Sequence, residues 1–182
     1  MRRRTFFKLA VATWPVLLSA TPAPLGIRQL AAEPGGNLVA VADFDYNDTS
    51  GEVTDQRAEH ATRVDAFSRH LRDRLAAEGK YKVLHLDCGK VTCSAGSVDA
   101  DDLVAAARDA GAQLLIYGGI QKMSTLIAWV SVRVVDVRQK QLLLNRLFSF
   151  RGDTDEAFAR AAKFISETLQ DVAPAGPPSN PN

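Results

Sequence analysis

The sequence is poor in the residues and motifs that mark catalytic centres. Its 182 residues include three histidines and two cysteines. None of the patterns H-E-x-x-H, G-x-S-x-G, G-x-x-x-x-G-K or G-x-G-x-x-G occurs, so the signatures of zinc proteases, serine hydrolases, P-loop enzymes and dinucleotide-binding enzymes are absent. The histidines, His60, His70 and His85, are scattered, and we expect them to be solvated. We predict a protein that is not an enzyme and needs no cofactor.

The sequence also lacks a basic stripe. Lysine and arginine number 22 against 21 aspartate and glutamate residues, for a formal net charge of +1. Residues 1–32 hold five of the bases and no acid, so the rest of the chain has 17 bases against 21 acids and a charge near −4. Proteins that bind nucleic acid concentrate positive charge to meet the phosphate backbone. We therefore expect no nucleic-acid partner.

No apolar run reaches the ~20 residues that a membrane-spanning helix needs. The longest, LAVATWPVLLSA, is interrupted by a proline and follows RRTFFK at Arg3–Lys8, which matches the twin-arginine export pattern. We predict that residues 1–32 are a twin-arginine signal peptide, with a retained anchor as the weaker alternative. Cleavage is expected after Ala32 or, alternatively, after Ala23, and no cysteine follows for lipid attachment. The mature protein is then periplasmic and has no stable membrane anchor.

The two cysteines, Cys88 and Cys93, lie close together in the polar segment HLDCGKVTCSAGS. In an oxidising compartment such a pair most simply forms a disulfide. Free thiols are one alternative. A metallochaperone site that uses Cys88, Cys93, His85 and Asp87 is another, because thiolate and imidazole ligands suit copper or zinc. Structural zinc sites usually show two paired cysteine motifs and this chain has one, so we favour the disulfide.

Hydrophobic periodicity predicts a single α/β domain, an α+β sandwich, over residues 33–172. The expected order is β-α-β-α-β-β-β-α, with helices packed on a mixed sheet. Strands are expected at 37–44, 81–86, 112–120, 125–137 and 142–150, and helices at 56–78, from an Asp99 N-cap to Gly111, and after an Asp153–Glu156 capping pair. The proline-rich residues 173–182 are expected to be a disordered tail.

Alternation and helical spacing also predict which residues are buried. In the fourth strand Leu126, Ala128, Val130, Val132 and Val134 share one face, while Ile127, Trp129, Ser131 and Arg133 share the other. In the last helix Phe158, Ala161, Phe164 with Ile165, and Leu169 make an apolar stripe.

The first predicted strand runs into a cluster of acids, VADFDYNDTSGEV at residues 41–53. A calcium loop would need glycine at Asp48 and glutamate at Thr54. The phosphoryl-transfer pattern D-x-D-x-T of haloacid dehalogenase-like phosphatases begins at Asp43 and Asp45 but meets Asn47 instead of threonine. We therefore expect polar side chains that bond their own backbone where the chain leaves the sheet. A metal-binding protein or phosphohydrolase that uses Asp43, Asp45 and Asp48 remains the alternative.

Several segments carry a resemblance to a known family. They are DF at 43–44, DTS at 48–50, LRDRL at 71–75, GAQLLIYGGIQKMSTLI at 111–127 and RGDTDEAF at 151–158. Together they resemble a family of small exported proteobacterial proteins grouped as domain of unknown function 2380, over about residues 37–170. The pieces QKMSTLI and RGDTDE are the most specific. No activity is known for the family, so the resemblance implies no catalytic residue.

More distantly, the element order is similar to three envelope domains: the N-terminal domain of the Tol-Pal propeller protein, the curli-secretion lipoprotein and the activators of penicillin-binding proteins. The residues that fit are Asp43, Phe44, Leu75, Gly79, Tyr81, Val83, Ala107, Gly111, Leu115 and Gly118. Those domains bind other proteins, which implies an envelope or periplasmic protein partner here.

These observations lead us to expect a non-enzymatic accessory or protein-binding module of the cell envelope, acting in assembly or transport. Its contact residues should be polar side chains that the core does not explain. The candidates are Asp45, Asp48, Thr49, Lys122, Ser124, Arg151 and Asp155.

Overall fold

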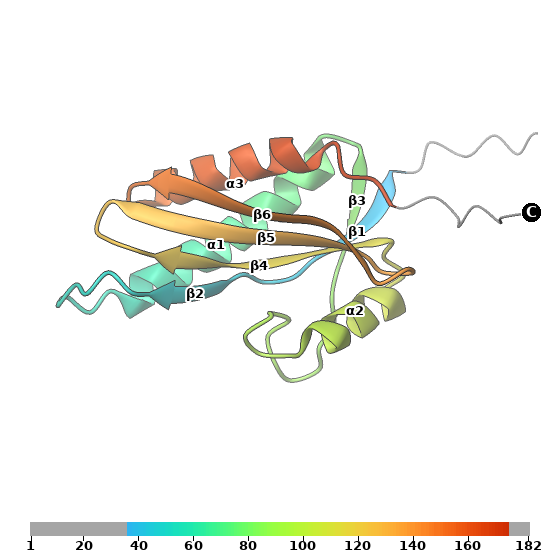
Figure 1. The fold of residues 1–182 in the computed structure, drawn as a ribbon, viewed down its shortest axis with the longest axis horizontal. Helices are drawn as coiled ribbons and strands as arrows, with labels where there is room; N and C mark the ends of the chain where they lie inside the picture. Colours follow the sequence, from blue (N-terminus) through green and yellow to red (C-terminus); the bar gives the residue numbers. More distant parts are fainter. Residues whose placement is uncertain (1–35, 175–182) are drawn as a thin grey trace, which may run out of the picture. The chain divides into compact units, whose positions relative to one another are not determined.

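A computed structural model describes residues 36–174, so the predicted signal peptide and nearly all of the predicted tail lie outside the described residues. Figure 1 shows the fold. The strands are β1 (Asn37–Val41), β2 (Asp45–Asp48), β3 (Tyr81–Leu84), β4 (Leu114–Lys122), β5 (Ile127–Asp136) and β6 (Gln141–Arg151), and the helices are α1 (Arg57–Ala77), α2 (Ala100–Asp109) and α3 (Asp155–Leu169). None of these helices has the length and apolar character needed to cross a membrane.

The strands form one open mixed sheet in the order β3-β1-β4-β5-β6, and β2 pairs with β4 beyond the end of β1. The pairings of β1 with β3 and β4 are parallel, whereas β4, β5 and β6 form an antiparallel meander. The predicted α+β fold with a mixed sheet is therefore confirmed. Helices α1 and α3 pack on one face, and α2 packs on the other.

The first predicted strand is divided into two, which corrects the expected range 37–44. Strand β1 ends at Val41, and pairing with β4 resumes at Asp45, opposite Gly119. Between them Phe44 turns into the core, where its ring meets Phe67 of α1 edge-on at 5.0 Å between centroids. Gly118 makes room for this ring, since a Cβ there would lie 2.9 Å from Phe44 and 1.9 Å from the carbonyl oxygen of Ser131. The segment Asp45–Asp48 of the acidic stretch is thus part of the sheet, and the chain leaves the sheet after Asp48.

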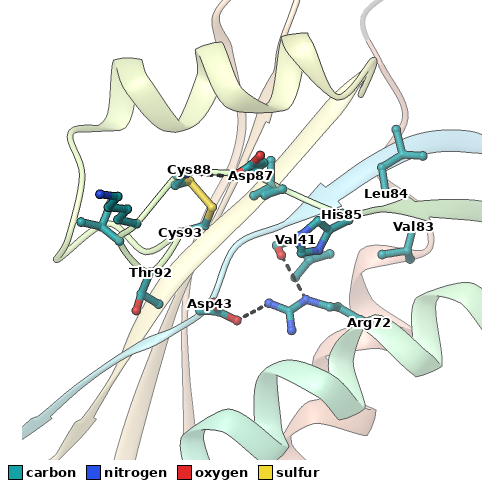
Figure 2. Close-up of a pocket in the computed structure, with 14 residues that line it drawn as sticks. Val41, Asp43, Arg72, Val83, Leu84, His85, Asp87, Cys88, Thr92 and Cys93 are labelled. Atoms are coloured by element: carbon teal, nitrogen blue, oxygen red, sulfur yellow. Dashed lines mark hydrogen bonds and ion pairs between the residues drawn. A yellow bond between two sulfur atoms is a disulfide. The ribbon is translucent and has the colours of Figure 1, made fainter.

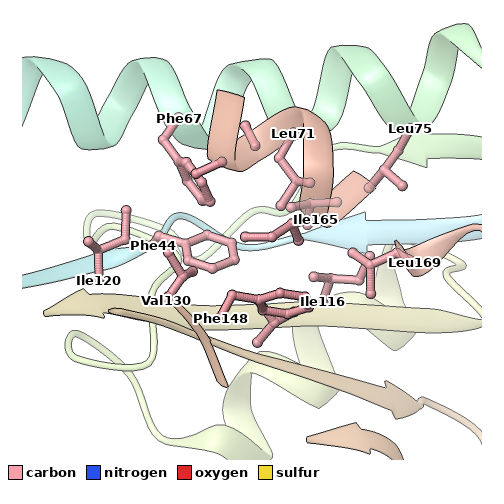
Figure 3. Packing of buried hydrophobic residues seen from close by; sticks show 14 of the residues in the cluster. Phe44, Phe67, Leu71, Leu75, Ile116, Ile120, Val130, Phe148, Ile165 and Leu169 are labelled. Carbon is pink, nitrogen blue, oxygen red and sulfur yellow. The ribbon is translucent and has the colours of Figure 1, made fainter. Parts of the chain in front are cut away.

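The main core lies between the sheet and the pair α1 and α3, as Figure 3 shows. Helix α1 contributes Phe67, Leu71 and Leu75, all fully buried and spaced three or four residues apart. Each such side chain stabilises the fold by roughly 1.5–3 kcal/mol. Gly79, at φ +74°, then lets the chain reverse into β3.

Helix α3 differs from the prediction at two points. Its N-cap is Thr154, whose hydroxyl accepts from the Ala157 N–H at 3.3 Å, and not Asp153. The buried stripe consists of Phe158, Ala161, Ile165 and Leu169, while Phe164 is 58% exposed. Neighbouring residues of a helix are rotated by about 100° about its axis, so Phe164 points to one side when Ile165 points toward the sheet. Leu126 is likewise exposed, since it precedes β5 and does not share its inward face.

Candidate functional site

A crevice opens where β1 and β3 end. The two strands lead to helices on opposite faces of the sheet, β1 through β2 to α1 and β3 without a further strand to α2, so the chain diverges beyond their carboxyl ends. Open α/β sheets bind ligands at such a position. The crevice has a volume of about 660 Å³ and is lined by Val41, Asp43, Arg72 and residues 83–93. Figure 2 shows Asp43 and Arg72 on one side of it and the cysteine loop on the other.

Asp43 is tied into the wall of this crevice. The Arg72 guanidinium donates to the Asp43 carboxylate and, through Nε, to the Val41 carbonyl at 3.1 Å. The Asp43 backbone N–H donates to the Cys93 carbonyl at 2.8 Å. The carboxylate that sequence reasoning considered as a metal ligand or phosphoryl acceptor is therefore paired with a guanidinium.

The other two aspartates of the acidic stretch have different partners. Asp45 accepts from the Ser94 hydroxyl at 2.6 Å and the Gly96 N–H at 2.8 Å. Asp48 accepts from the hydroxyl and the N–H of Ser50, and these bonds hold the pKa of Asp48 below its ordinary value. Because each carboxylate is bound separately, Asp43, Asp45 and Asp48 do not form one site. Nowhere in residues 36–174 do three His, Cys, Asp or Glu side chains converge as a metal site would require.

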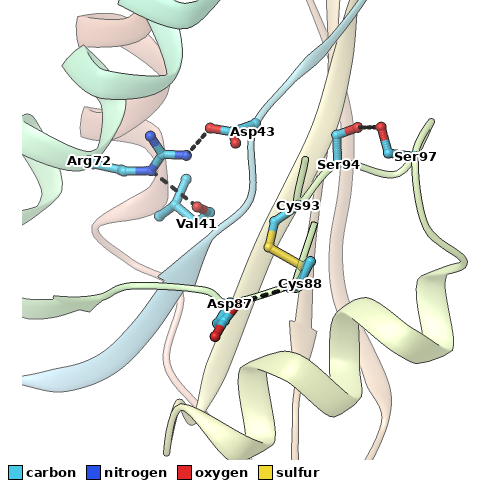
Figure 4. Close-up of a disulfide and its surroundings, with 9 residues drawn as sticks. Val41, Asp43, Arg72, Asp87, Cys88, Cys93, Ser94 and Ser97 are labelled. Carbon is cyan, nitrogen blue, oxygen red and sulfur yellow. Dashed lines mark hydrogen bonds and ion pairs between the residues drawn. A yellow bond between two sulfur atoms is a disulfide. The ribbon is translucent and has the colours of Figure 1, made fainter. Parts of the chain in front are cut away.

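The cysteine loop is closed by a disulfide between Cys88 and Cys93, as predicted (Figure 4). The bond uses both sulfurs, so the oxidised protein offers no thiolate to join His85 in the alternative metallochaperone site. The loop is also fixed to the sheet, since Cys93 accepts from Asp43 and Ser94 donates to Asp45. This wall of the crevice is therefore held by one covalent link and by polar contacts to the segment after β1.

A second group of polar residues lies at the far end of β4, and we call it the Lys122 network. The Lys122 ammonium donates to Asp153 at 2.6 Å, to Gln56 at 3.0 Å and to the Glu52 carboxylate. The sequence predicts Lys122 as an exposed contact residue, but it is only 2% exposed. Lys122 shares the face of β4 that α1 and α3 cover, so its side chain points toward the starts of both helices.

Two further side chains complete the Lys122 network by binding Asp153. His60 Nε2 lies 2.8 Å from one carboxylate oxygen, and Arg63 donates to the other at 2.9 Å. His60 was expected to be solvated, but it is 2% exposed and packs against the ring of Tyr46 at 4.7 Å between centroids. Asp153 therefore serves as the central anion of the network, which explains why Thr154 and not Asp153 caps α3.

The Lys122 network favours the charged forms of Asp153 and Lys122 in spite of burial. Burial alone raises the pKa of Asp153, but hydrogen bonds and charge from Lys122 and His60 outweigh it and lower that pKa. Burial lowers the pKa of Lys122, but the carboxylates of Asp153 and Glu52 outweigh it and raise that pKa. The adjoining side chains leave no ligand-sized volume beside Lys122. The arrangement therefore fits a structural tie between β4, α1 and α3 better than a reaction centre.

The remaining predicted contact residues surround this same end of the sheet. Thr49 donates to the Lys122 carbonyl through its N–H and its hydroxyl, both at 2.9 Å. The Ser124 hydroxyl accepts from two N–H groups in the turn between β4 and β5. Arg151 is exposed at the end of β6, and Asp155 accepts from Arg63 at 3.0 Å. The structure therefore gathers Asp48, Thr49, Lys122, Ser124, Arg151 and Asp155 at one end, while Asp45 joins the cysteine loop.

Sequence reasoning missed Arg72, Glu52, His60 and Arg63. Each is paired with a residue 29 to 93 positions away. No local spacing can indicate such a pair. The three residues that lie on α1, His60, Arg63 and Arg72, occupy positions that the spacing assigns to an ordinary polar face. The only signal was that Lys122 and Asp153 lie within the two most specific motifs of the resemblance, QKMSTLI and RGDTDE.

A third feature is an exposed apolar surface on the α2 side of the sheet. Helix α2 lies at the end where β1 and β3 are found (Figure 1), and it covers Leu115 and Val135 there. At the opposite end no described element covers the sheet. Four large apolar residues, which we call the outer-face patch, are exposed there: Leu126 by 67%, Ile127 by 39%, Trp129 by 36% and Leu147 by 59%. Trp129 pairs with Ser149, so Leu147 is its diagonal neighbour across the strands.

Comparison with known proteins gives similar solved structures, including the three that follow. The PelC dodecamer from Paraburkholderia phytofirmans has 12% identity and a TM-score of 0.48, covering 75% of this chain and 86% of that chain. The LpoB C-terminal domain from Salmonella enterica has 14% identity and a TM-score of 0.43, covering 63% and 82%. TolB from Acinetobacter baumannii has 13% identity and a TM-score of 0.44, covering 74% and 28%.

No curated protein matches the chain. One family model does, over residues 37–169, which span nearly all of the described domain. The match includes both QKMSTLI and RGDTDE, the segments that contribute Lys122 and Asp153 to the network. The chain therefore belongs to the family described as Protein of unknown function (DUF2380).

Proposed function

We propose that this domain is a non-enzymatic protein-binding module of the bacterial cell envelope, which works in the periplasm after export through the twin-arginine route. The observation that carries the proposal is the outer-face patch. Trp129, Ile127 and Leu147 lie next to one another on a sheet face whose other end is covered by a helix. A sheet normally buries its apolar face, so a partner protein that covers this end would complete the packing.

The composition of the patch suits protein recognition. Tryptophan is enriched among the residues that dominate binding energy, and apolar area that is removed from water contributes about 25 cal/mol per Å². Ser131, Arg133 and Ser149 border the patch on the same face, which provides the polar rim that interfaces usually have. The polar clusters of the domain also fit a binding role better than a catalytic one. The charged side chains of the Lys122 network bind one another, and Asp43 binds Arg72, so these groups already have partners within the domain.

Site-specific photo-cross-linking in living cells tests this proposal. The photoreactive amino acid p-benzoylphenylalanine is placed at Trp129 or Leu147 in the full chain, with Lys82 on the opposite edge strand as the exposed control position. We expect one defined adduct with an envelope protein from positions 129 and 147, and none from position 82. A Trp129→Asp substitution should weaken the adduct from position 147. Equal labelling at all three positions, or no adduct from the folded protein, would contradict the proposal.

The cellular location is tested separately. Changing Arg3 and Arg4 to lysine should prevent release of the protein in the periplasmic fraction, because the twin-arginine pattern requires both arginines. Unchanged periplasmic release of that variant would exclude this export route, while leaving the binding role of the outer-face patch open to the cross-linking test.

A further inference from the structure

Strand β6 is an edge strand that nothing else in the described chain pairs with. It runs for 11 residues and bonds β5 on one side, and no strand within residues 36–174 lies on its other side. Such an edge presents a row of backbone N–H and C=O groups that can accept another strand. Natural proteins usually shorten, bulge or cover such an edge. The pairing of β6 has one irregularity, opposite Val134 and Val135, and is regular from Leu144 to Arg151, so this regular free part needs an explanation.

A groove runs between this free edge and helix α3. It has a volume of about 310 Å³ and is formed by residues 148–151 of β6 and by the face of α3 between Ala157 and Ile165. Phe148, Phe150 and Phe164 supply aromatic walls, and Phe164 is 58% exposed although its ring meets Phe148 edge-on at 6.0 Å. A free strand edge beside a helix, with an apolar floor between them, is the arrangement into which extended peptides add as an extra strand.

The charge around this groove is positive although the domain as a whole is acidic. Arg151 and Arg160 line the groove, and Arg146 lies over the Phe148 ring at 5.2 Å. None of these three arginines forms an ion pair with any residue in the described chain. Arg160 acts on Glu156, one helical turn away, only through its charge, which helps to lower the pKa of that carboxylate. Guanidinium groups in this position are available to bind carboxylates of an incoming chain.

We propose that β6 and α3 form a docking groove for an extended acidic segment of a partner protein. The segment adds to the sheet as a strand beside β6, places alternate apolar side chains in the groove, and sets aspartate or glutamate side chains against Arg151 and Arg160. This inference rests on the proposed binding function and names the chemistry of the partner.

The same observations argue against a second copy of this chain as the occupant. Strand β6 carries two arginines and no aspartate or glutamate. A second β6 strand paired along this edge would therefore add positive charge and offer no carboxylate to Arg151, and like charges across strands are destabilising. The three phenylalanines of the groove likewise favour a peptide with apolar side chains over a purely polyanionic ligand.

Fluorescence anisotropy with the protein purified from the periplasm tests the groove. The probe is a fluorescein-labelled ten-residue peptide in which aspartate or glutamate alternates with valine or phenylalanine. Two companion peptides keep the same apolar residues: one carries lysine in place of the acids, and one is N-methylated at every second residue. We expect saturable binding of the acidic peptide, at least tenfold weaker binding of the lysine peptide, and loss of binding on N-methylation, because N-methyl groups block strand pairing.

Variants assign the binding to the groove. Arg151→Ala with Arg160→Ala should weaken the acidic peptide about tenfold, and Phe164→Asp should weaken it further, both at exposed positions that leave the fold intact. Arg74→Ala, an exposed arginine in the last turn of α1, is the control and should leave the affinity unchanged.

Equal binding of the three peptides, unchanged affinity of the groove variants, or no binding at millimolar peptide would overturn the inference. A dimer that disappears with the Arg151 and Phe164 changes would replace the acidic segment by a second copy and so overturn it too. If adducts at Trp129 persist while the acidic peptide does not bind, strand addition at β6 fails and the proposed function stands. Binding of the acidic peptide without adducts at Trp129 would support strand addition at β6 and contradict the outer-face patch as the binding surface.

Discussion

Replacing Lys122 by methionine tests whether the Lys122 network holds the three parts of the fold together. The Lys122 side chain is 3% exposed and binds two carboxylates, of which Asp153 is 16% and Glu52 is 24% exposed. Methionine keeps most of the length of the side chain and removes its charge. The substitution therefore leaves the apolar packing nearly intact and takes the ammonium away from both carboxylates.

The expected loss of stability can be placed within a range. Removing one partner of a buried ion pair costs about 3–5 kcal/mol, because the other charge stays buried without its counter-ion. Here Asp153 keeps Arg63 and His60, and Glu52 can turn to water. We therefore expect the lower end, about 3 kcal/mol, which is a large part of the ~5–15 kcal/mol that stabilises a typical domain.

Urea unfolding at neutral pH measures this loss. The transition midpoint of Lys122→Met should fall with little change in slope, and the control Lys163→Met should differ from the wild type by no more than about 0.5 kcal/mol. Lys163 is the matched control because it is half exposed and pairs with Glu167 one turn away. A loss below about 1 kcal/mol in Lys122→Met would refute the reasoning, since the network would then be no more than a surface cluster.

The pH dependence of stability gives an independent check on the direction in which the pKa of Asp153 is shifted. The pKa of Asp153 is lowered in the folded protein from its ordinary value of 3.8. Its ionisation therefore stabilises the fold above that value, and the stabilisation is lost as the pH falls through the lowered pKa. The difference in unfolding free energy between wild type and Asp153→Asn should accordingly be largest near neutral pH and shrink below about pH 4. A difference that grows on acidification would contradict the direction of the shift.

Three other substitutions have defined outcomes. Gly118→Ala should lower the unfolding free energy by about 2–3 kcal/mol, because its Cβ would lie 1.9 Å from the Ser131 carbonyl oxygen; Gly119→Ala, with 3.5 Å to its nearest neighbour, should cost far less in the same urea assay. Changing both cysteines to serine should cost about 2 kcal/mol in thermal or urea unfolding, as a ring this small predicts, and full stability of the serine variant would contradict this. Asp45→Ala should cost about 1–2 kcal/mol and speed hydrogen exchange around residues 94–97. Asp48→Ala loses the bonds to Ser50 and a 3.9 Å contact with His60 but nothing at residues 94–97, so it should leave that exchange unchanged.

Most of the architecture was accessible from hydrophobic spacing. The apolar positions of α1 recur every three or four residues, and alternation in β5 separates Val130 and Val132 from Trp129, so both elements were predicted, and the two faces of β5 were correctly separated. Strand β2 was missed because its residues, DYND, have low strand propensity. It forms through pairing with β4, a contact between residues more than 70 positions apart that local pattern does not record.

The candidate sites were predictable only where one short segment carries the information. The disulfide followed from two neighbouring cysteines and an oxidising compartment. The burial of Lys122 did not, because lysine is normally exposed and becomes buried here only through carboxylates that the segments before α3 and before α1 supply. Phe164 shows the same limit, since a helical stripe defines an approximate face and the exact packing decides which of two adjacent apolar residues is left outside.

Helix α3 follows every other element of the domain in the sequence, which has a consequence for the order in which native contacts can form. The main core gains Phe158 and Ile165, and Lys122 gains Asp153, only after β6 has been synthesised. A growing chain that has reached β6 thus lacks one of the two helices that cover the main core, and its Lys122 ammonium lacks one of its two carboxylate partners. Until α3 has been made, this apolar face of the sheet is only partly covered and is open to non-native contacts.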